Sequence, residues 1–152
     1  MSQFRSYMDL ALAEARAAAA RGEVPVGAVV VAPSGAVVAQ AGNRTRELCD
    51  PSAHAEMLAI RAACAALGQE RLVGHDLYVT LEPCPMCAAV ISAARIARLY
   101  YGAADPKSGG VAVGARVFTH PQCHHVPEVY DGLAEAEAAA LLRDFFATRR
   151  GA

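Results

Sequence analysis

Residues 77–101 constrain the fold of this 152-residue chain more than any other segment. Residues 77–81 (Leu-Tyr-Val-Thr-Leu) have the pattern of a short strand, residues 98–101 that of a second strand, and residues 86–94 that of a helix. Pro85 is well placed to open this helix, because proline fits the first helical position. Two strands joined through a crossover helix run parallel in one sheet, so the segment predicts an α/β fold.

A hairpin is predicted nearer the N-terminus. Residues 24–31 are rich in valine and nearly continuously apolar, which is the pattern of a strand buried on both faces. A turn at 33–35 (Pro-Ser-Gly) leads to a second strand at 37–39. The sheet is therefore expected to be mixed, with parallel and antiparallel pairs.

Helices are predicted on both sides of this sheet. Apolar residues at helical spacing favour helices over residues 3–20 and 133–149. Another helix is expected after Ser52, which is a candidate N-cap, and it ends at Gly68. The predicted architecture is a mixed central sheet with helices on both faces.

The length and composition indicate a single domain covering residues 1–152. The sequence has no repeat, linker or change in composition that would mark a boundary. We also expect no secretory leader and no membrane contact, because the apolar N-terminal stretch is interrupted by Glu14 and Arg16. These features favour a cytoplasmic protein.

Charge and cysteine content limit the function further. The formal net charge of −1 argues against coating nucleic acid non-specifically, so RNA binding would need a local basic patch. Lys107 is the only lysine, and the excess of arginine fits either phosphate recognition or the base composition of the genome. The five cysteines of an intracellular chain favour a metal or catalytic use over disulfides.

Two short motifs carry the candidate chemistry. His54-Ala-Glu56 and Pro83-Cys84-Pro-Met-Cys87 each fall at the predicted start of a helix. Two such helix starts facing each other would bring one imidazole and two sulfurs together, and helix N-termini favour thiolates. Zinc accepts two cysteines and one histidine in catalytic sites and keeps a fourth position for water.

Glu56 distinguishes this pattern from a structural zinc knuckle. A carboxylate two residues from a histidine ligand, and not itself a ligand, can take a proton from the water and return it to a leaving group. The other interpretations of Cys-x-x-Cys are a redox pair, half of a zinc ribbon, or a non-catalytic metal scaffold. No second Cys-x-x-Cys completes a ribbon, and a scaffold has no use for Glu56.

The two motifs resemble the signature of the zinc deaminases that act on cytosine and adenine. Over nearly its whole length the chain also resembles the bacterial tRNA adenosine deaminases of the TadA type. The matching segments lie at residues 23–29, 42–44, 53–56, 77–84, 86–87, 101–103, 105–109 and 145–146. The resemblance implies a cytidine-deaminase-like three-layer sandwich with a five-stranded mixed sheet.

The same resemblance implies the chemistry of the site. His54, Cys84 and Cys87 would hold one Zn²⁺ per subunit, and zinc-bound hydroxide would attack C6 of adenine while Glu56 carries the proton, giving inosine and ammonia. Backbone groups near Ala55 and the Pro83-Cys84 peptide would hold the intermediate. The implied substrate is the wobble adenosine in the anticodon stem-loop of the arginine tRNA with anticodon ACG, bound by a homodimer in which each subunit helps to form the RNA site of the other.

The resemblance also implies substrate contacts. Asn43 would contact the flipped nucleoside, and Glu23 would line the same pocket; an Asx turn is the alternative for Asn43. The remaining candidate contacts come from a loop and from the C-terminal helix: Asp105, Lys107, Phe145, Arg149 and Arg150. Arg44, Arg46 and Arg116 are further candidates for the RNA backbone. The alternative for the C-terminus is a partly buried phenylalanine pair followed by a solvated helix end.

A few chemically reactive residues lie outside these motifs. The cluster His120, Cys123, His124 and His125 matches no common zinc pattern, and we expect at least one member to line the RNA or base pocket. Cys64 is expected in the core, Cys49 as a bystander, and Glu82 as a residue that orients a ligand or caps a helix.

The main alternative function is deamination of a free base or nucleoside such as guanine or cytosine, because Pro-Cys-Pro-Met-Cys also occurs in guanine deaminases. The Gly-Asn-Arg loop at 42–44, the loop at 105–109 and the C-terminal Phe-Phe and Arg-Arg pairs favour tRNA.

Overall fold

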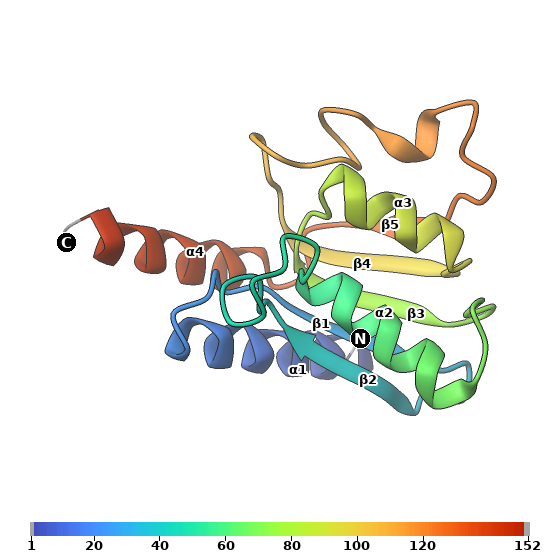
Figure 1. Cartoon of the computed structure of the whole chain (residues 1–152), viewed down its shortest axis with the longest axis horizontal. Helices are drawn as coiled ribbons and strands as arrows, with labels where there is room; N and C mark the ends of the chain where they lie inside the picture. Colours follow the sequence, from blue (N-terminus) through green and yellow to red (C-terminus); the bar gives the residue numbers. More distant parts are fainter. Residues whose placement is uncertain (1, 151–152) are drawn as a thin grey trace.

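The computed structural model describes residues 2–150, with side chains from residue 4 to residue 149 (Figure 1). Its centre is a sheet of five strands in the order β2-β1-β3-β4-β5. The strands are β1 (Gly27–Val31), β2 (Val37–Gly42), β3 (Asp76–Leu81), β4 (Arg98–Ala103) and β5 (Glu128–Tyr130). The helices are α1 (Ser2–Ala20), α2 (Ala55–Leu67), α3 (Pro85–Ala93), α4 (Glu135–Arg150) and a short 3₁₀ helix, η1 (Val117–Thr119).

Strand pairing confirms the two predicted units. β1 pairs antiparallel with β2, which is the hairpin, and antiparallel with β3 on its other side. β3 and β4 pair in parallel, as the crossover through α3 requires. β4 and β5 are also parallel. The sheet is therefore mixed, and the α/β class predicted from the sequence is confirmed.

Helices cover both faces of the sheet and make three layers (Figure 1). α1 and α4 pack on one face, where Met8, Leu12 and Ala138 contact the strand residues Val29 and Tyr78. α2 and α3 pack on the other face in a second apolar cluster that includes Ile60 and Ile91. The long segment between β4 and β5 passes over the outer side of α3.

The structure departs from the sequence prediction at several places: β1 begins at Gly27 and not at residue 24, and β2 continues to Gly42. Ser52 does not cap α2, because its hydroxyl donates to Asp50 and the N-cap position is occupied by His54. The run 128–130 forms β5, which no sequence periodicity indicated; all three of its residues are exposed, so the alternation that marks a half-buried strand is missing.

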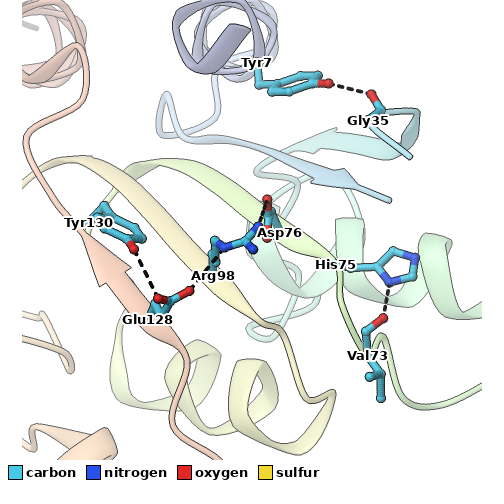
Figure 2. A network of polar contacts seen from close by, with 8 residues as sticks. All are labelled: Tyr7, Gly35, Val73, His75, Asp76, Arg98, Glu128 and Tyr130. Carbon is cyan, nitrogen blue, oxygen red and sulfur yellow. Dashed lines mark hydrogen bonds and ion pairs between the residues drawn. The ribbon is translucent and has the colours of Figure 1, made fainter. Parts of the chain in front are cut away.

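The end of the sheet at the starts of β3, β4 and β5 is held by two rows of side chains, the first of which is drawn in Figure 2. Arg98 bridges Asp76 and Glu128 at 3.3 and 3.1 Å, and the three residues are neighbours in the strand register. In the next row Tyr78 stacks on Tyr100, with ring centroids 4.4 Å apart, and Tyr100 stacks on Tyr130. These rows stiffen the end of the sheet that lies opposite the starts of α2 and α3.

Gly27 sets how closely α1 approaches β1, and this leads to a prediction. A Cβ atom at residue 27 would lie 1.9 Å from the carbonyl oxygen of Ala11 and 2.7 Å from the amide nitrogen of Ala15. Gly27→Ala should therefore force α1 off the sheet and lower the free energy of unfolding by at least about 2 kcal/mol. Urea denaturation measures this.

Gly68→Ala is the matched control, because a Cβ there meets nothing within 4 Å. Its cost should be limited to about 1 kcal/mol for a left-handed conformation in a residue other than glycine. Equal destabilisation by both variants would contradict the assigned role of the close approach at Gly27.

Candidate active site

Two helix starts meet where β3 leaves the sheet. His54 is the N-cap of α2 and Cys84 the N-cap of α3, and neither helix start has a side-chain cap. Pro85 occupies the first turn of α3, as predicted, and Cys87 follows in the same turn, fully buried. The open backbone N–H groups of both helices therefore point toward one small region that favours negative charge.

The three predicted ligand side chains lie together in this region. Nδ1 of His54 is 3.6 Å from Sγ of Cys84 and 3.5 Å from Sγ of Cys87. Among the described residues these three form the group of histidine, cysteine or acidic side chains whose ligand atoms all lie within 4.8 Å of one another.

These separations fit a zinc ion. With Zn–S bonds of about 2.3 Å, a Zn–N bond of about 2.0–2.1 Å and tetrahedral angles, a nitrogen and a sulfur ligand are about 3.5–3.6 Å apart. Both observed distances agree with that value. Two sulfurs and one imidazole also match the donor preference of zinc, and three protein ligands leave a fourth position for water.

Proton affinities in the group reflect the close contact of the two sulfurs. A hydrogen bond from Cys87, with help from His54, lowers the pKa of Cys84 to about 4. The same contact with Cys84, together with burial, raises the pKa of Cys87. The hydrogen bond with Cys84 raises the pKa of His54. A divalent cation bound by all three side chains would displace the shared proton and stabilise both thiolates.

Glu56 lies in the first turn of α2, and only 4% of its surface is exposed. Burial is the main cause that raises the pKa of its carboxyl group to about 7. Glu56 lines the pocket together with His54 and Cys84. A carboxyl group in this position can accept and return a proton close to the three donors.

The pocket above these groups has a volume of about 240 Å³. Its apolar lining comes from Val24, Val26 and Leu81. Its polar lining comes from Glu82 and from two loops, with Asn43 and Thr45 in one and Asp105 and Ser108 in the other. Ala55 is also part of the wall. A space of this size with few polar groups suits one flat heterocycle.

Asn43 is placed as predicted, on the wall of the pocket. It is buried, and its Nδ2 donates to the hydroxyl of Thr45 at 3.4 Å. The Asx turn considered for Asn43 belongs to Asp50 instead, whose Oδ1 accepts the N–H of Ser52 at 2.9 Å. The hydrogen bond from the Ser52 hydroxyl is the main cause that lowers the pKa of Asp50, and the hydrogen bond from the Ser52 N–H is the second.

Two predicted substrate contacts lie elsewhere. Glu23 is not on the pocket wall: it is buried, and its carboxylate accepts the N–H groups of Arg46 and Glu47 at 3.1 and 2.7 Å. Pro83 also lies behind the wall, where its carbonyl accepts the N–H of Gly110 at 2.8 Å. Both residues hold loops and do not face the space for a base.

A second hollow of about 660 Å³ continues from the pocket toward α4. The two share Val24, Leu81, Asp105 and Ser108, and the outer hollow adds Lys107, Leu142, Phe146 and Arg149. We refer to this outer hollow as the α4 groove.

The two phenylalanines of α4 differ in their position relative to the α4 groove, and contact of Phe145 with RNA stays a prediction. Phe145 does not line the groove; its ring lies under the guanidinium of Arg149, 4.2 Å from the centroid, and Phe146 lines the groove in its place. Arg150 is the last residue of α4, and its side chain lies outside the described residues.

The other basic candidates lie outside both hollows. Arg44 pairs with Glu47, Arg46 donates weakly to the carbonyl of Gly22, and Arg116 has a left-handed backbone before η1. Cys49 is exposed and Cys64 is half-buried against the core. None of these residues contributes to the pocket or the α4 groove.

The His120–His125 cluster lies beyond α3, away from the pocket. His120, Cys123 and His124 line a separate hollow of about 440 Å³ against the outer face of α3 and do not line the base pocket. Contact of this cluster with RNA stays a prediction. Nε2 of His125 contacts the carbonyl of Ile96 at 2.6 Å.

Sequence reasoning missed Thr45, Ser108 and Phe146 as wall residues. Each of them follows a residue that was proposed from the sequence as a substrate contact. A sequence motif alone does not decide which of two adjacent side chains faces the pocket or the groove.

Hydrolytic removal of an amino group from a nucleobase requires a cation that activates water and a proton carrier beside it. This chain has the donor set and a buried glutamate, in the fold that zinc-dependent deaminases use, and it is an enzyme of that class.

Comparison with known proteins makes this specific. Residues 1–103 match the family model for the cytidine and deoxycytidylate deaminase zinc-binding region. A tRNA-specific adenosine deaminase from Agrobacterium fabrum is 63% identical over 150 residues, which is 99% of this chain and 98% of the relative. The chain therefore belongs to the cytidine and deoxycytidylate deaminase family, among the tRNA-specific adenosine deaminases.

Solved structures agree with this placement. A structure from a study of A-to-I editing by tRNA:A34 deaminases at the wobble position of transfer RNA has a TM-score of 0.88 and 65% identity, and the match covers 90% of this chain and 99% of that one. A guanine deaminase from Nitrosomonas europaea has a TM-score of 0.81 and 25% identity, over 94% of this chain and 84% of that one.

Proposed function

We propose that this enzyme converts the wobble adenosine of tRNA, nucleotide 34, to inosine with release of ammonia. The observation that carries the proposal is a base-sized pocket that holds the His54, Cys84 and Cys87 donors beside Glu56 and opens into the α4 groove. The high identity to tRNA-specific adenosine deaminases supports the choice of substrate. The finer assignment is the arginine tRNA with anticodon ACG.

In this proposal His54, Cys84 and Cys87 hold one zinc ion per chain, which supplies Lewis acidity and lowers the pKa of a water molecule. Glu56 would carry one proton of that water to the ring nitrogen and then carry the second proton, from the hydroxyl now on the carbon, to the departing amino group. Overall, water adds its oxygen to the carbon that carried the amino group, the carbon–nitrogen bond breaks, and ammonia leaves.

The pocket wall positions the base. The Asn43 side chain can donate to one edge atom of the purine and accept from another. The N–H groups at the start of α2, beginning with Ala55, face the region where negative charge develops and stabilise it. Asp105 and Ser108 contact the base or its ribose from the other loop.

The α4 groove favours a polynucleotide over a free base. A free purine fills the inner pocket and has no use for Lys107 and Arg149, which supply two positive charges beside the exposed ring of Phe146. Phosphates and a stacked neighbouring base use all three. Guanine deamination remains the second candidate, because a guanine deaminase shares the fold.

We also propose a homodimer as the active form, a single deaminase domain over residues 1–152, and a cytoplasmic location alongside tRNA. The outward face of α3 carries the exposed residues Pro85, Ala89 and Ala93, next to the 440 Å³ hollow, and this flat apolar face suits a second copy of the chain. Sedimentation at micromolar concentration should give twice the mass of one chain. Within residues 2–150 no helix is long and apolar enough to cross a membrane.

The proposed function is tested with a zinc-loaded enzyme and five substrates in parallel: a stem-loop with anticodon ACG, the same stem-loop with GCG, and free guanine, cytosine and adenosine. Inosine and ammonia from the ACG stem-loop alone support the proposal. Turnover of a free base with no reaction on either stem-loop would favour the second candidate.

Arg149 gives a sharper test of the α4 groove. Arg149→Ala removes one positive charge at the groove, and we expect the Kd for the ACG stem-loop to rise about tenfold and the salt slope of log Kd to fall by about 1. Arg143→Ala is the matched control, since Arg143 is exposed on the same helix and does not line the groove. If the two variants behave identically, Arg149 does not contact the RNA and the end of α4 is only a solvated helix end. Fluorescence anisotropy at several salt concentrations measures both quantities.

A further inference from the structure

Glu82 is the last residue before the Pro83-Cys84 peptide, and its carboxylate is fully committed to one loop. Oε1 accepts the N–H of Asp105 at 3.1 Å, and Oε2 accepts the N–H groups of Val111 and Ala112 at 3.2 and 2.9 Å. The residue is 2% exposed. Glu82 is part of the wall of the base pocket, but three donors occupy its two oxygens and it does not cap α3.

The loop that Glu82 holds also forms a wall of the pocket. Asp105 and Ser108 line the base pocket, and Lys107 continues the same loop into the α4 groove. The Asp105 side chain tightens the turn by accepting the N–H groups of Lys107 and Ser108 at 3.2 and 3.1 Å. The position of this wall therefore depends on where Asp105 and the 111–112 peptide are anchored.

Gly109 shows how tightly the loop is packed on the carboxylate. A Cβ atom on Gly109 would lie 2.5 Å from Oε2 of Glu82 and 2.7 Å from the carbonyl oxygen of Asp105. Glycine is therefore needed at this position for the loop to reach the carboxylate. The close packing at Gly109 is therefore a second observation, besides the hydrogen bonds, that the loop lies directly against the Glu82 carboxylate.

The anchor connects the wall to the cation site. Glu82 lies two residues before Cys84, and the neighbouring Pro83 carbonyl accepts the N–H of Gly110. One short segment thus holds both a sulfur donor and the substrate wall, so the distance between them is fixed by covalent geometry and by buried hydrogen bonds.

We propose that Glu82 is a positioning residue for the deamination: its buried carboxylate holds the 105–112 loop in register with Cys84, and so fixes where Asp105 and Ser108 meet the base and its ribose. The expected effect on kinetics rests on the proposed function. The anchoring of the loop rests on the geometry alone.

The test disrupts the contact between Glu82 and the loop with two variants, one in Glu82 and one in the loop. Glu82→Gln keeps the size of the side chain but puts an NH₂ group against N–H donors, and Gly109→Ala pushes the loop away while leaving Glu82 intact. Glu70→Gln, an exposed carboxylate at the far end of α2, is the control. Each zinc-loaded variant is measured for hydrogen exchange of the 105–112 amides, for zinc content and for KM and kcat on the ACG stem-loop.

We expect both loop variants to speed exchange at Val111 and Ala112 by about tenfold, which corresponds to one hydrogen bond of ordinary strength. KM should rise by a similar factor of about ten with a smaller change in kcat, because the wall acts on substrate placement. Zinc content should remain at one ion per chain, and Glu70→Gln should match the wild type.

Each other result overturns the proposal. Unchanged exchange would show that the carboxylate does not anchor the loop. Faster exchange with an unchanged KM would show that the loop is not a substrate wall. Loss of zinc together with activity would show that Glu82 acts through Cys84. If Glu82→Gln does not fold, Gly109→Ala decides on the same criteria. A wild type inactive on the stem-loop removes the proposed function, and the exchange data still test the anchored loop.

Discussion

Glu56→Gln is expected to lower the rate of inosine formation by about 10³-fold while the protein keeps its zinc and its fold. The change replaces one oxygen by NH₂ in a side chain that lines the pocket beside His54 and Cys84. An amide cannot accept a proton from water or deliver one to a leaving amine. The loss corresponds to about 4 kcal/mol of activation free energy.

Single-turnover kinetics on the ACG stem-loop measures this effect, because it isolates the chemical step from product release. Glu47→Gln is a suitable control: Glu47 is an exposed carboxylate in the neighbouring loop that pairs with Arg44 and does not line the pocket. A Glu56→Gln enzyme that retains more than about one tenth of the wild-type rate would remove Glu56 from proton transfer.

Cys87→Ser is expected to remove the metal and the activity together. Cys87 is fully buried, and its sulfur lies 3.5 Å from Nδ1 of His54, so the site has no room to recruit another ligand from solvent. Loss of an outer-shell partner alone costs about 10- to 100-fold in metal affinity, and loss of a ligand should cost more than about 100-fold. The melting temperature should also stop responding to added zinc.

Elemental analysis after dialysis gives the zinc content, and Cys49→Ser provides the matched control. Cys49 is exposed and its sulfur donates to the carbonyl of Arg46, away from the pocket, so this variant should keep one zinc ion per chain and full activity. Stoichiometric zinc in Cys87→Ser would contradict the proposed ligand set.

Local pattern predicted the class of the fold because its main elements each have a clear signature. The valine run became β1, the segment 77–101 became β3, α3 and β4, and Gly68 ends α2 in the left-handed conformation that glycine favours. β5 was missed because it is three exposed residues held by backbone pairing with β4 and by contacts with Arg98 and Tyr100, and such long-range contacts leave no periodic pattern in the local sequence.

The candidate ligands were predictable for a related reason. His54 and Cys84 each end up as the residue that begins a helix, and helix starts can be located from proline and from apolar spacing. Their meeting in space follows because α2 and α3 start after β2 and β3, whose carboxyl ends lie at the same end of one sheet.

The roles of two other buried acids, Glu23 and Glu82, could not be predicted. Glu23 and Glu82 each accept backbone N–H groups from a loop more than twenty residues further along the chain. Any residue other than proline supplies such a donor, so no side-chain pattern identifies the partner. Phe145 and Phe146 show a second limit, since adjacent helical residues point about 100° apart and only packing decides which one lines the α4 groove.

Anomalous diffraction across the zinc absorption edge tests the central claim most directly. Crystals of the zinc-loaded enzyme should give one strong peak per chain, bonded to Nδ1 of His54 and to both sulfurs of Cys84 and Cys87, with Glu56 beside it and unbound. A peak bonded to other side chains, or no peak in crystals of an enzyme that still makes inosine, would contradict the account.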